Sequence, residues 1–205
     1  MYKIITSKST VIVCDNSLYD KEKSHLVLPS KLDNRWLEKQ KSVSLNKIKF
    51  LYVGRINPEK GILKFIELFK SLKLNATLSI LSESKNINET CEDIKYLDHV
   101  FEAEALIDIY DDHNIMILPS YTEGHPQVVI ESLARKRPVI IFEEISHIVK
   151  NRKGIFVAKR QKDHLLKTIK NIMQNYKAIQ EEMNLNQLPT KEEFFLKMTK
   201  ILNKN

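Results

Sequence analysis

The stretch SYTEGHPQVVIESLA carries two carboxylates, Glu123 and Glu131, eight positions apart. The first falls in an expected loop, and the second falls in an expected helix that begins at Pro126. Two carboxylates that converge on one ligand can accept hydrogen bonds from its hydroxyl groups. The same helix also makes a polar stripe of Gln127, Glu131 and Arg135. An exposed Glu131–Arg135 pair worth ~0.3–0.5 kcal/mol is therefore the alternative interpretation.

A second stretch, VGRINPEKG, places two cations where an expected strand passes into a helix. Gly54 allows a tight turn, and Asn57 is suited to cap the helix. Arg55 and Lys60 flank this turn, where free backbone N–H groups already favour an anion. A guanidinium and an ammonium suit a diphosphate, although a capped helix with two surface cations explains the same residues. The spacing matches neither G-x-G-x-x-G nor the Walker A loop.

The composition indicates a soluble globular protein with one core, because 42% of the 205 residues are hydrophobic and 29% are charged. Lysine and arginine number 33 against 26 acidic residues, a net charge of +7. This excess favours nucleotide phosphates, nucleic acid or an anionic membrane surface as partners, unless it serves solubility alone. No apolar run approaches the roughly 18 residues of a membrane span. The N-terminus lacks the apolar stretch of a signal peptide, so we expect a cytoplasmic protein.

Cysteine and histidine give no sign of a disulfide framework or a metal site. Cys14 and Cys91 lie far apart and in no CxxC spacing, so we expect free thiols. The six histidines are scattered, without HExxH or a His/Asp cluster. We therefore expect no protein-bound metal.

From about residue 47, short apolar runs alternate with longer amphipathic stretches, which is typical of βα units around a parallel sheet. The fold class is thus expected to be α/β, a Rossmann-like, doubly wound parallel sheet of about six strands. Strands are expected at 48–53, 76–81, 99–101, 115–118, 138–142 and 154–157. Helices are expected at 58–73, 104–112, 126–136 and 161 to about 181, with a poorly defined helical segment after the second strand.

The ends of the chain differ from this pattern and suggest three regions. Residues 1–46 hold one strand candidate, STVIVCD, and a lysine-rich polar linker. Residues 47–183 form the expected Rossmann-like domain. Residues 184–205 form a tail that ends in an expected helix.

Topology brings the two motifs together. In a parallel sheet of order 3-2-1-4-5-6, strands 1 and 4 are neighbours, and ligands bind at the carboxyl ends of the strands where the order reverses. The loop with Arg55 and Lys60 follows strand 1, and the loop with Glu123 follows strand 4. Cations for a diphosphate would then face carboxylates for hydroxyl groups. A sugar nucleotide offers both.

GRINPEKG, followed about sixty residues later by LPSYTEGHPQVVIESLARKRPVI, resembles the C-terminal, donor-binding half of retaining glycosyltransferases of the GT-B fold, family 4 or glycosyl transferases group 1. The resemblance implies that Arg55 and Lys60 bind the donor diphosphate, beside the turn at Gly54. It places Glu123 near the transferred sugar and Glu131 on the nucleotide ribose. It also implies that the loop after the first glutamate contacts sugar or phosphate oxygens through its backbone; this loop is Gly124, His125, Pro126 and Gln127.

The resemblance covers about residues 48–180 and has clear departures. STVIVCD and VLPSKLD resemble the end of the family's N-terminal half and its linker, and the tail resembles the helix that crosses back to that half. The acceptor-binding N-terminal domain itself is missing from this chain. LSILSES has no glycine after the second strand, Lys136 stands where glycine is common, and VLPSKLD lacks the usual Asn-Gly.

The function implied is hexosyl transfer in polysaccharide biosynthesis, from a UDP- or GDP-linked sugar to a glycan or lipid-linked acceptor, with retention of anomeric configuration. No other cofactor is expected, because preorganised cations can stabilise the leaving diphosphate without a metal. Arg55, Lys60 and Glu123 are the expected catalytic residues. The acceptor half would come from the rest of the gene product or from a second chain.

Two other functions stay open. One is a non-catalytic module that binds a nucleotide sugar. The other is a basic nucleic-acid-binding protein, which the absence of RNP, helix-turn-helix and zinc patterns disfavours. Peripheral contact with the inner face of the membrane is a further hypothesis, because the helix from 161 carries a face of lysines, which could equally be solvated: Lys162, Lys167, Lys170 and Lys177.

Overall fold

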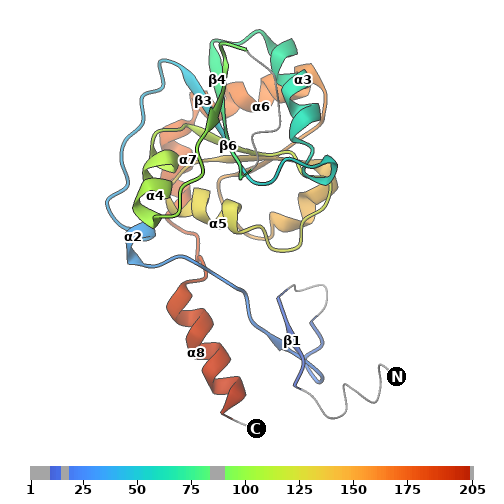
Figure 1. Cartoon of the computed structure of the whole chain (residues 1–205), viewed down its shortest axis with the longest axis vertical. Helices are drawn as coiled ribbons and strands as arrows, with labels where there is room; N and C mark the ends of the chain where they lie inside the picture. The colour runs from blue at the N-terminus through green and yellow to red at the C-terminus, as the bar shows by residue number, and fades with distance from the viewer. Residues whose placement is uncertain (1–9, 15–18, 84–90, 204–205) are drawn as a thin grey trace.

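A six-stranded parallel sheet forms the centre of the computed structural model, which describes residues 10–14, 19–83 and 91–203 (Figure 1). The order across the sheet is β5-β4-β3-β6-β7-β8, and all neighbours run parallel. The predicted doubly wound sheet is confirmed, with the first and fourth strands adjacent. The strands are β3 (Ile48–Val53), β4 (Ala76–Leu81), β5 (Ile94–Leu97), β6 (Ile115–Leu118), β7 (Val139–Phe142) and β8 (Ile155–Ala158).

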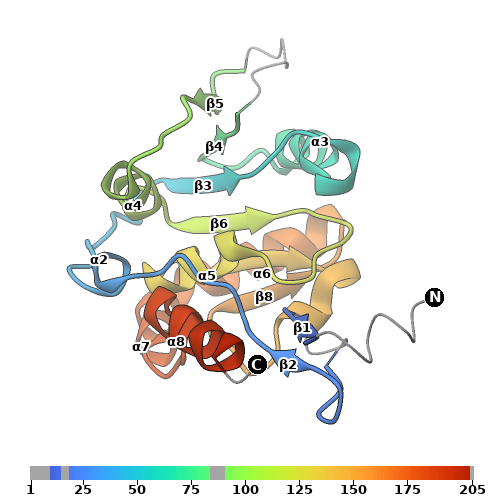
Figure 2. The ribbon, with the colours of Figure 1, turned by 60° about the horizontal axis from the view of Figure 1, so that its bottom comes forward.

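Helices cover both faces of the sheet (Figures 1 and 2). Every residue of β6 and β7 is buried, as in parallel strands that are packed on both sides. Helix α3 (Ile62–Leu72) contacts α6 (Lys162–Gln174), whereas α5 (Gln127–Ala134) packs on β6 and β7. The core side of α3 consists of Ile62, Phe65, Ile66, Phe69 and Leu72, the set that the helical spacing predicts.

The third strand differs from the prediction. It is Ile94–Leu97, whereas residues 99–101 lie outside any strand. Ile94 is buried beside β4, but Phe101 is 91% exposed and contacts only the edge of the His99 ring among aromatic side chains of the described residues. The strand lies at the edge of the sheet and only Ile94 in it is buried, and Lys95 interrupts its apolar residues, so no continuous apolar run marks it. The helical segment expected after the second strand falls largely on 84–90, outside the described residues.

Two expected helices are each broken into two. Residues 58–73 form the short 3-10 helix η2 (Pro58–Lys60) and α3, because Gly61 between them has a left-handed backbone with φ 65°. The expected helix from 161 ends at Gln174 and is followed by α7 (Tyr176–Met183). Helix α4 (Ala103–Asp111) lies close to its predicted position. Lys136, after α5, has φ 55°, a conformation that favours glycine.

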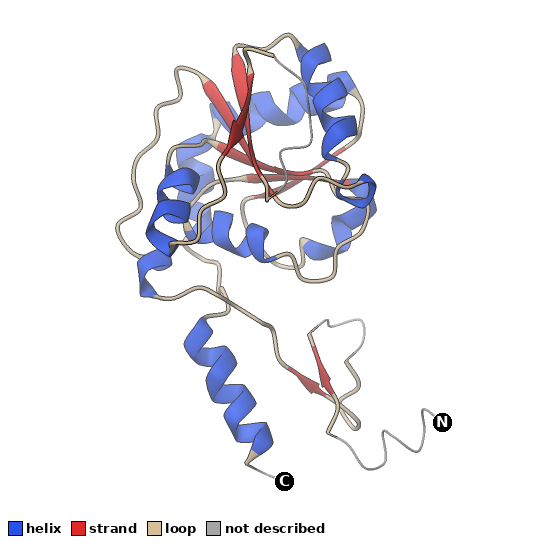
Figure 3. Cartoon of the chain, in the orientation of Figure 1, coloured by secondary structure: helices blue, strands red, loops and turns tan. Residues whose placement is uncertain are grey.

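The small strands near the N-terminus and the last helix lie near each other, away from the sheet (Figure 3). Strands β1 (Ile12–Val13) and β2 (His25–Leu26) form a small parallel pair. The predicted final helix is α8 (Lys191–Leu202), which begins with a Thr190 capping box. Between these ends and the sheet lies α2 (Asn34–Leu37), whose Trp36 is buried in the main core. Cys14 and Cys91 are free thiols. Across the described ranges no helix has the length and apolarity that a bilayer crossing requires.

Candidate functional site

The turn after β3 is shaped by hydrogen bonds on both sides of Arg55. The Gly54 N–H donates to a carbonyl at the end of β4 at 3.0 Å, and the Tyr52 hydroxyl donates to the Arg55 carbonyl at 2.6 Å. Burial raises the pKa of Tyr52, so this donor stays protonated. The Asn57 side chain caps η2, as predicted. The Arg55 guanidinium is exposed and forms no hydrogen bond or ion pair within the described ranges.

Close packing at Gly61 joins this turn to the loop after β6. A Cβ atom at Gly61 would lie 2.1 Å from the Pro119 carbonyl oxygen, so the position excludes every side chain. The Tyr121 N–H donates to the Glu59 carbonyl at 2.9 Å. The two motif-bearing loops therefore touch, as the strand order predicts.

Lys60 and Glu123 meet where these loops touch. Lys60 Nζ lies 2.6 Å from Glu123 Oε1, which also accepts from Ser120 Oγ at 2.7 Å. The Lys60 and Glu123 side chains are only 24% and 10% exposed. His147 Nε2, from the 3-10 helix η3 (Glu143–Ile148), donates to the Glu123 carbonyl at 2.7 Å. A cation and a carboxylate from the two motifs are thus held together at one point.

Glu131 is a buried carboxylate on α5. It is 6% exposed and accepts a hydrogen bond from the Tyr110 hydroxyl at 2.8 Å. Burial raises the pKa of Glu131, while its hydrogen bond from Tyr110 and the charge of Lys31 act in the opposite direction. The Tyr110 ring also packs edge-on against Trp36, with ring centroids 5.6 Å apart. The linker and α4 therefore both help to place this carboxylate.

The alternative of an exposed Glu131–Arg135 pair is wrong. Arg135 is 1% exposed and pairs with Asp111 of α4 through Nε at 3.0 Å and Nη2 at 2.6 Å. Both residues of the expected pair are buried, but they bind different neighbours. Glu131 consequently has no ion-pair partner within the described ranges.

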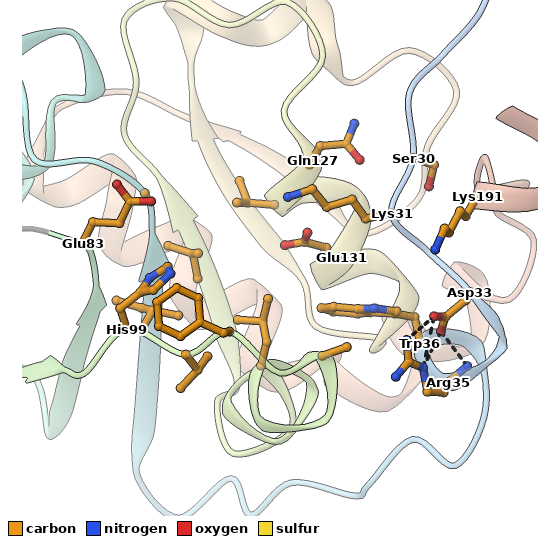
Figure 4. Close-up of a pocket in the computed structure, with 18 of the residues that line it drawn as sticks. Ser30, Lys31, Asp33, Arg35, Trp36, Glu83, His99, Gln127, Glu131 and Lys191 are labelled. Carbon is orange, nitrogen blue, oxygen red and sulfur yellow. Dashed lines mark hydrogen bonds and ion pairs between the residues drawn. The ribbon is translucent and has the colours of Figure 1, made fainter. Parts of the chain in front are cut away.

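A pocket of about 830 Å³ opens beyond the carboxyl ends of β3 and β4 (Figure 4). Four predicted residues line it, namely Gly54, Arg55, Gln127 and Glu131. Figure 4 shows the side chains of Gln127, Lys31 and Glu131 together on one wall, with His99 and Glu83 on the opposite side. The walls thus offer a free guanidinium and a buried carboxylate to the same space.

The other predicted residues lie outside the lining of this pocket. Lys60 and Glu123 form their pair at the adjoining loop junction. In the loop Gly124–Gln127, His125 Nε2 and Gln127 Nε2 both lie near the Pro29 carbonyl, at 3.0 and 2.9 Å. Pro126 caps α5. His125 and Gln127 therefore fasten this loop to the linker, and of its four residues Gln127 alone lines the pocket.

Sequence reasoning missed the residues that bind the linker to the domain. Arg135 donates to linker carbonyls at 36, 38 and 39, and Arg137 donates to the carbonyl of residue 41. The available signal was two arginines in ARKRPV, between an amphipathic helix and an apolar strand. Lys31 was also missed as a pocket residue, although the departure of VLPSKLD from the usual Asn-Gly pointed to this segment. Within the described ranges no group of three His, Cys, Asp or Glu side chains is placed to hold a metal.

Comparison with known proteins places this geometry in a family. The capsular polysaccharide biosynthesis glycosyltransferase CapM of Staphylococcus aureus is 30% identical over 145 residues, which are 62% of this chain and 37% of CapM. Sucrose-phosphate synthase of Thermosynechococcus elongatus has a similar fold, with a TM-score of 0.75 at 18% identity over 99% of this chain and 60% of that one. Anabaena HepE, solved with UDP and glucose, has a TM-score of 0.72 at 13% identity over 96% of this chain and 63% of HepE.

The matched region thus spans little more than a third of CapM. The structural matches show that the fold is that of GT-B glycosyltransferases. The model of the family named glycosyl transferases group 1 matches residues 34–187. This range includes both motifs and the linker carbonyls at 36, 38 and 39 that accept from Arg135. This chain therefore belongs to the glycosyl transferases group 1 family.

Proposed function

We propose that this chain is the donor-binding domain of a glycosyltransferase that uses a nucleoside diphosphate sugar. Arg55 and Lys60 bind the diphosphate, beside the turn at Gly54. Glu131 accepts hydrogen bonds from the ribose hydroxyls, and Glu123 accepts them from the sugar. The observation that carries the proposal is the shared pocket of Arg55 and Glu131, because a free cation suits phosphate and a carboxylate without an ion-pair partner suits hydroxyl groups.

The Lys60–Glu123 pair supplies the reacting end of the site. A donor phosphate would compete with Glu123 for the Lys60 ammonium, since both are anionic acceptors. The displaced carboxylate would then accept hydrogen bonds from the sugar. As the sugar–oxygen bond breaks, Lys60 and Arg55 stabilise the charge that grows on the leaving diphosphate, without a metal. Retention of anomeric configuration is part of the proposal and is supported by the family motifs.

The acceptor half is proposed to come from outside this chain, since CapM extends far beyond the matched region. The name of CapM supports a role in polysaccharide biosynthesis, for which we propose a glycan or lipid-linked acceptor. The presence of UDP and glucose in the HepE structure supports a UDP-linked donor. We take UDP first and GDP second as the nucleotides to test.

Thermal unfolding with added UDP, UDP-glucose, GDP or GDP-mannose, in EDTA, tests the proposal. A ligand at 100 times its Kd stabilises the folded state by about 2.7 kcal/mol, which is a rise in Tm of roughly 5–10 °C for a chain of this size. Arg55→Ala and Lys60→Ala should each reduce the rise. Lys64→Ala is the matched control, because Lys64 is exposed on α3 and pairs only with Glu67 within the described ranges. A Tm that no nucleotide changes at millimolar concentration would refute donor binding.

Membrane contact is a separate proposal that rests on the lysine face of α6 and α7. All four lysines named for this face are exposed. A cytoplasmic protein held at the inner face of a membrane would bind liposomes that contain anionic lipid. Sedimentation with neutral liposomes to the same extent would rule out the electrostatic contact.

A further inference from the structure

Arg160, just after β8, lies between two aromatic rings. Its guanidinium carbon is 4.1 Å from the centroid of the Tyr121 ring and 4.4 Å from that of Phe142. The side chain is 22% exposed, and Nε donates to Glu144 Oε1 at 2.8 Å. Stacking on both rings and pairing with a carboxylate fix the plane of the guanidinium.

The fixed guanidinium faces the loop that carries Glu123. Arg160 Nη2 donates to the Pro119 carbonyl at 2.8 Å and approaches the Ser120 carbonyl at 3.3 Å. The Pro119 carbonyl is also the atom against which Gly61 packs. Arg160 thus holds the β6 loop at its contact with the turn that carries Lys60.

The effect extends from the backbone of Ser120 to its side chain. Ser120 is fully buried, and its hydroxyl donates to the Glu123 oxygen that Lys60 also contacts. A shift of the Ser120 backbone would move this donor and the carboxylate with it. A lysine at 160 could not replace the arginine, because an ammonium lacks the planar fork that stacks and donates at once.

We propose that Arg160 is a positioning residue of the donor site, which sets the Lys60–Glu123 pair where the transferred sugar binds. The role at the sugar rests on the proposed function, but the positioning itself does not. Arg160 lies outside the lining of the pocket that contains Arg55 and Glu131. Its removal should therefore affect the sugar end of the donor and leave the nucleotide end nearly unchanged.

The first experiment needs no ligand. A double-mutant cycle with Lys60→Met and Glu123→Gln, read by thermal unfolding, measures the coupling of the pair. In the parent, we expect the Tm change of the double variant to differ from the sum of the two single changes. In the Arg160→Lys background, we expect the two single changes to add. Arg152→Lys is the control, because Arg152 is half-buried and, within the described ranges, donates to the Ile148 carbonyl and to no atom of the loop that carries Glu123. Coupling that survives unchanged in Arg160→Lys would overturn the proposal.

The second experiment measures the Kd of UDP and of UDP-glucose by calorimetry. Arg160→Lys should weaken the binding of UDP-glucose about tenfold, which is the effect of losing one charge-assisted hydrogen bond. The same substitution should weaken the binding of UDP by no more than about twofold. Equal weakening of both would indicate a general structural defect and reject the positioning role. If neither ligand binds the parent, the proposed function fails, while the ligand-free cycle still decides the role of Arg160.

Discussion

Replacement of Arg135 by methionine should destabilise the protein far more than a surface change would. The substitution keeps an unbranched, apolar side chain of similar length but removes every donor of the guanidinium. Among the side chains of the described residues, Asp111, which is completely buried, would keep only its contact with Arg137 Nη2 at 3.4 Å. Leaving one partner of a buried ion pair without its charge costs ~3–5 kcal/mol. For a chain of this length, this corresponds to a fall in Tm of roughly 6–20 °C.

The same substitution should also release the linker. The carbonyls of Trp36, Glu38 and Lys39 each accept from Arg135, and these bonds tie the segment after α2 to α5. Without them the segment opens more often, and proteases cleave backbone that opens locally. Limited trypsin digestion of Arg135→Met should therefore begin at Lys39 or Lys41 at temperatures where the parent resists.

Calorimetry of three variants and the parent tests the reasoning. Arg152→Met is the matched control and should lower Tm by less than half as much, because Arg152 has no carboxylate partner within the described ranges. Asp111→Asn combined with Arg135→Met should recover part of the loss, since the carboxylate that has lost its main partner is then removed, while Arg137 loses only its 3.4 Å contact with Asp111. If Arg135→Met melts within about 2 °C of the parent, the buried pair contributes little and the estimate is refuted.

Three further changes have expected results. Gly61→Ala should lower Tm and weaken UDP binding, because the left-handed backbone alone costs about 1–2 kcal/mol and the new methyl would meet the Pro119 carbonyl; an unchanged Tm would show that the two loops are not locked. Lys31→Gly, which removes a cation from the pocket lining, should weaken UDP binding in low salt and have a smaller effect in high salt, as titrations at two ionic strengths would show. Burial raises the pKa of Glu131 in the folded state above its usual 4.5. The neutral side chain therefore contributes to protein stability below pH 4.5, and this contribution is lost as the pH rises through the folded-state pKa. Glu131→Gln should accordingly gain Tm over the parent at pH 8 and lose that gain at pH 4.

The sheet could be predicted because its strands are almost wholly buried. IMIL and VIIF are continuous apolar runs, and parallel strands covered on both faces produce such runs. The edge strand β5 could not be found in this way, since only Ile94 is buried and polar residues surround it. The break at Asn175 was also hidden, because the apolar spacing continues across it from α6 into α7.

The sequence was sufficient to predict which loops form the candidate site. It was not sufficient to predict which side chains in these loops contact each other. Strand order fixes which loops meet, so the proximity of the Lys60 turn and the Glu123 loop follows from the sequence. Pairing between Lys60 and Glu123 depends on side-chain packing around Ser120, for which the sequence has no periodic signal. The role of the linker was also hidden, because Pro29 meets α5 and Trp36 meets α4 only through the tertiary fold.

Glu131 and Arg135 of α5 do not pair with each other because α4 offers each of them another partner. Residues four apart on a helix pair with each other only where water surrounds them and no stronger partner is present. Here α4 presents two consecutive residues, Tyr110 to Glu131 and Asp111 to Arg135, and burial strengthens both contacts. Arg135 is thereby committed to the linker and to Asp111. Glu131 keeps a neutral donor in place of a cation, so one of its oxygens can still accept from a ligand hydroxyl at the pocket wall.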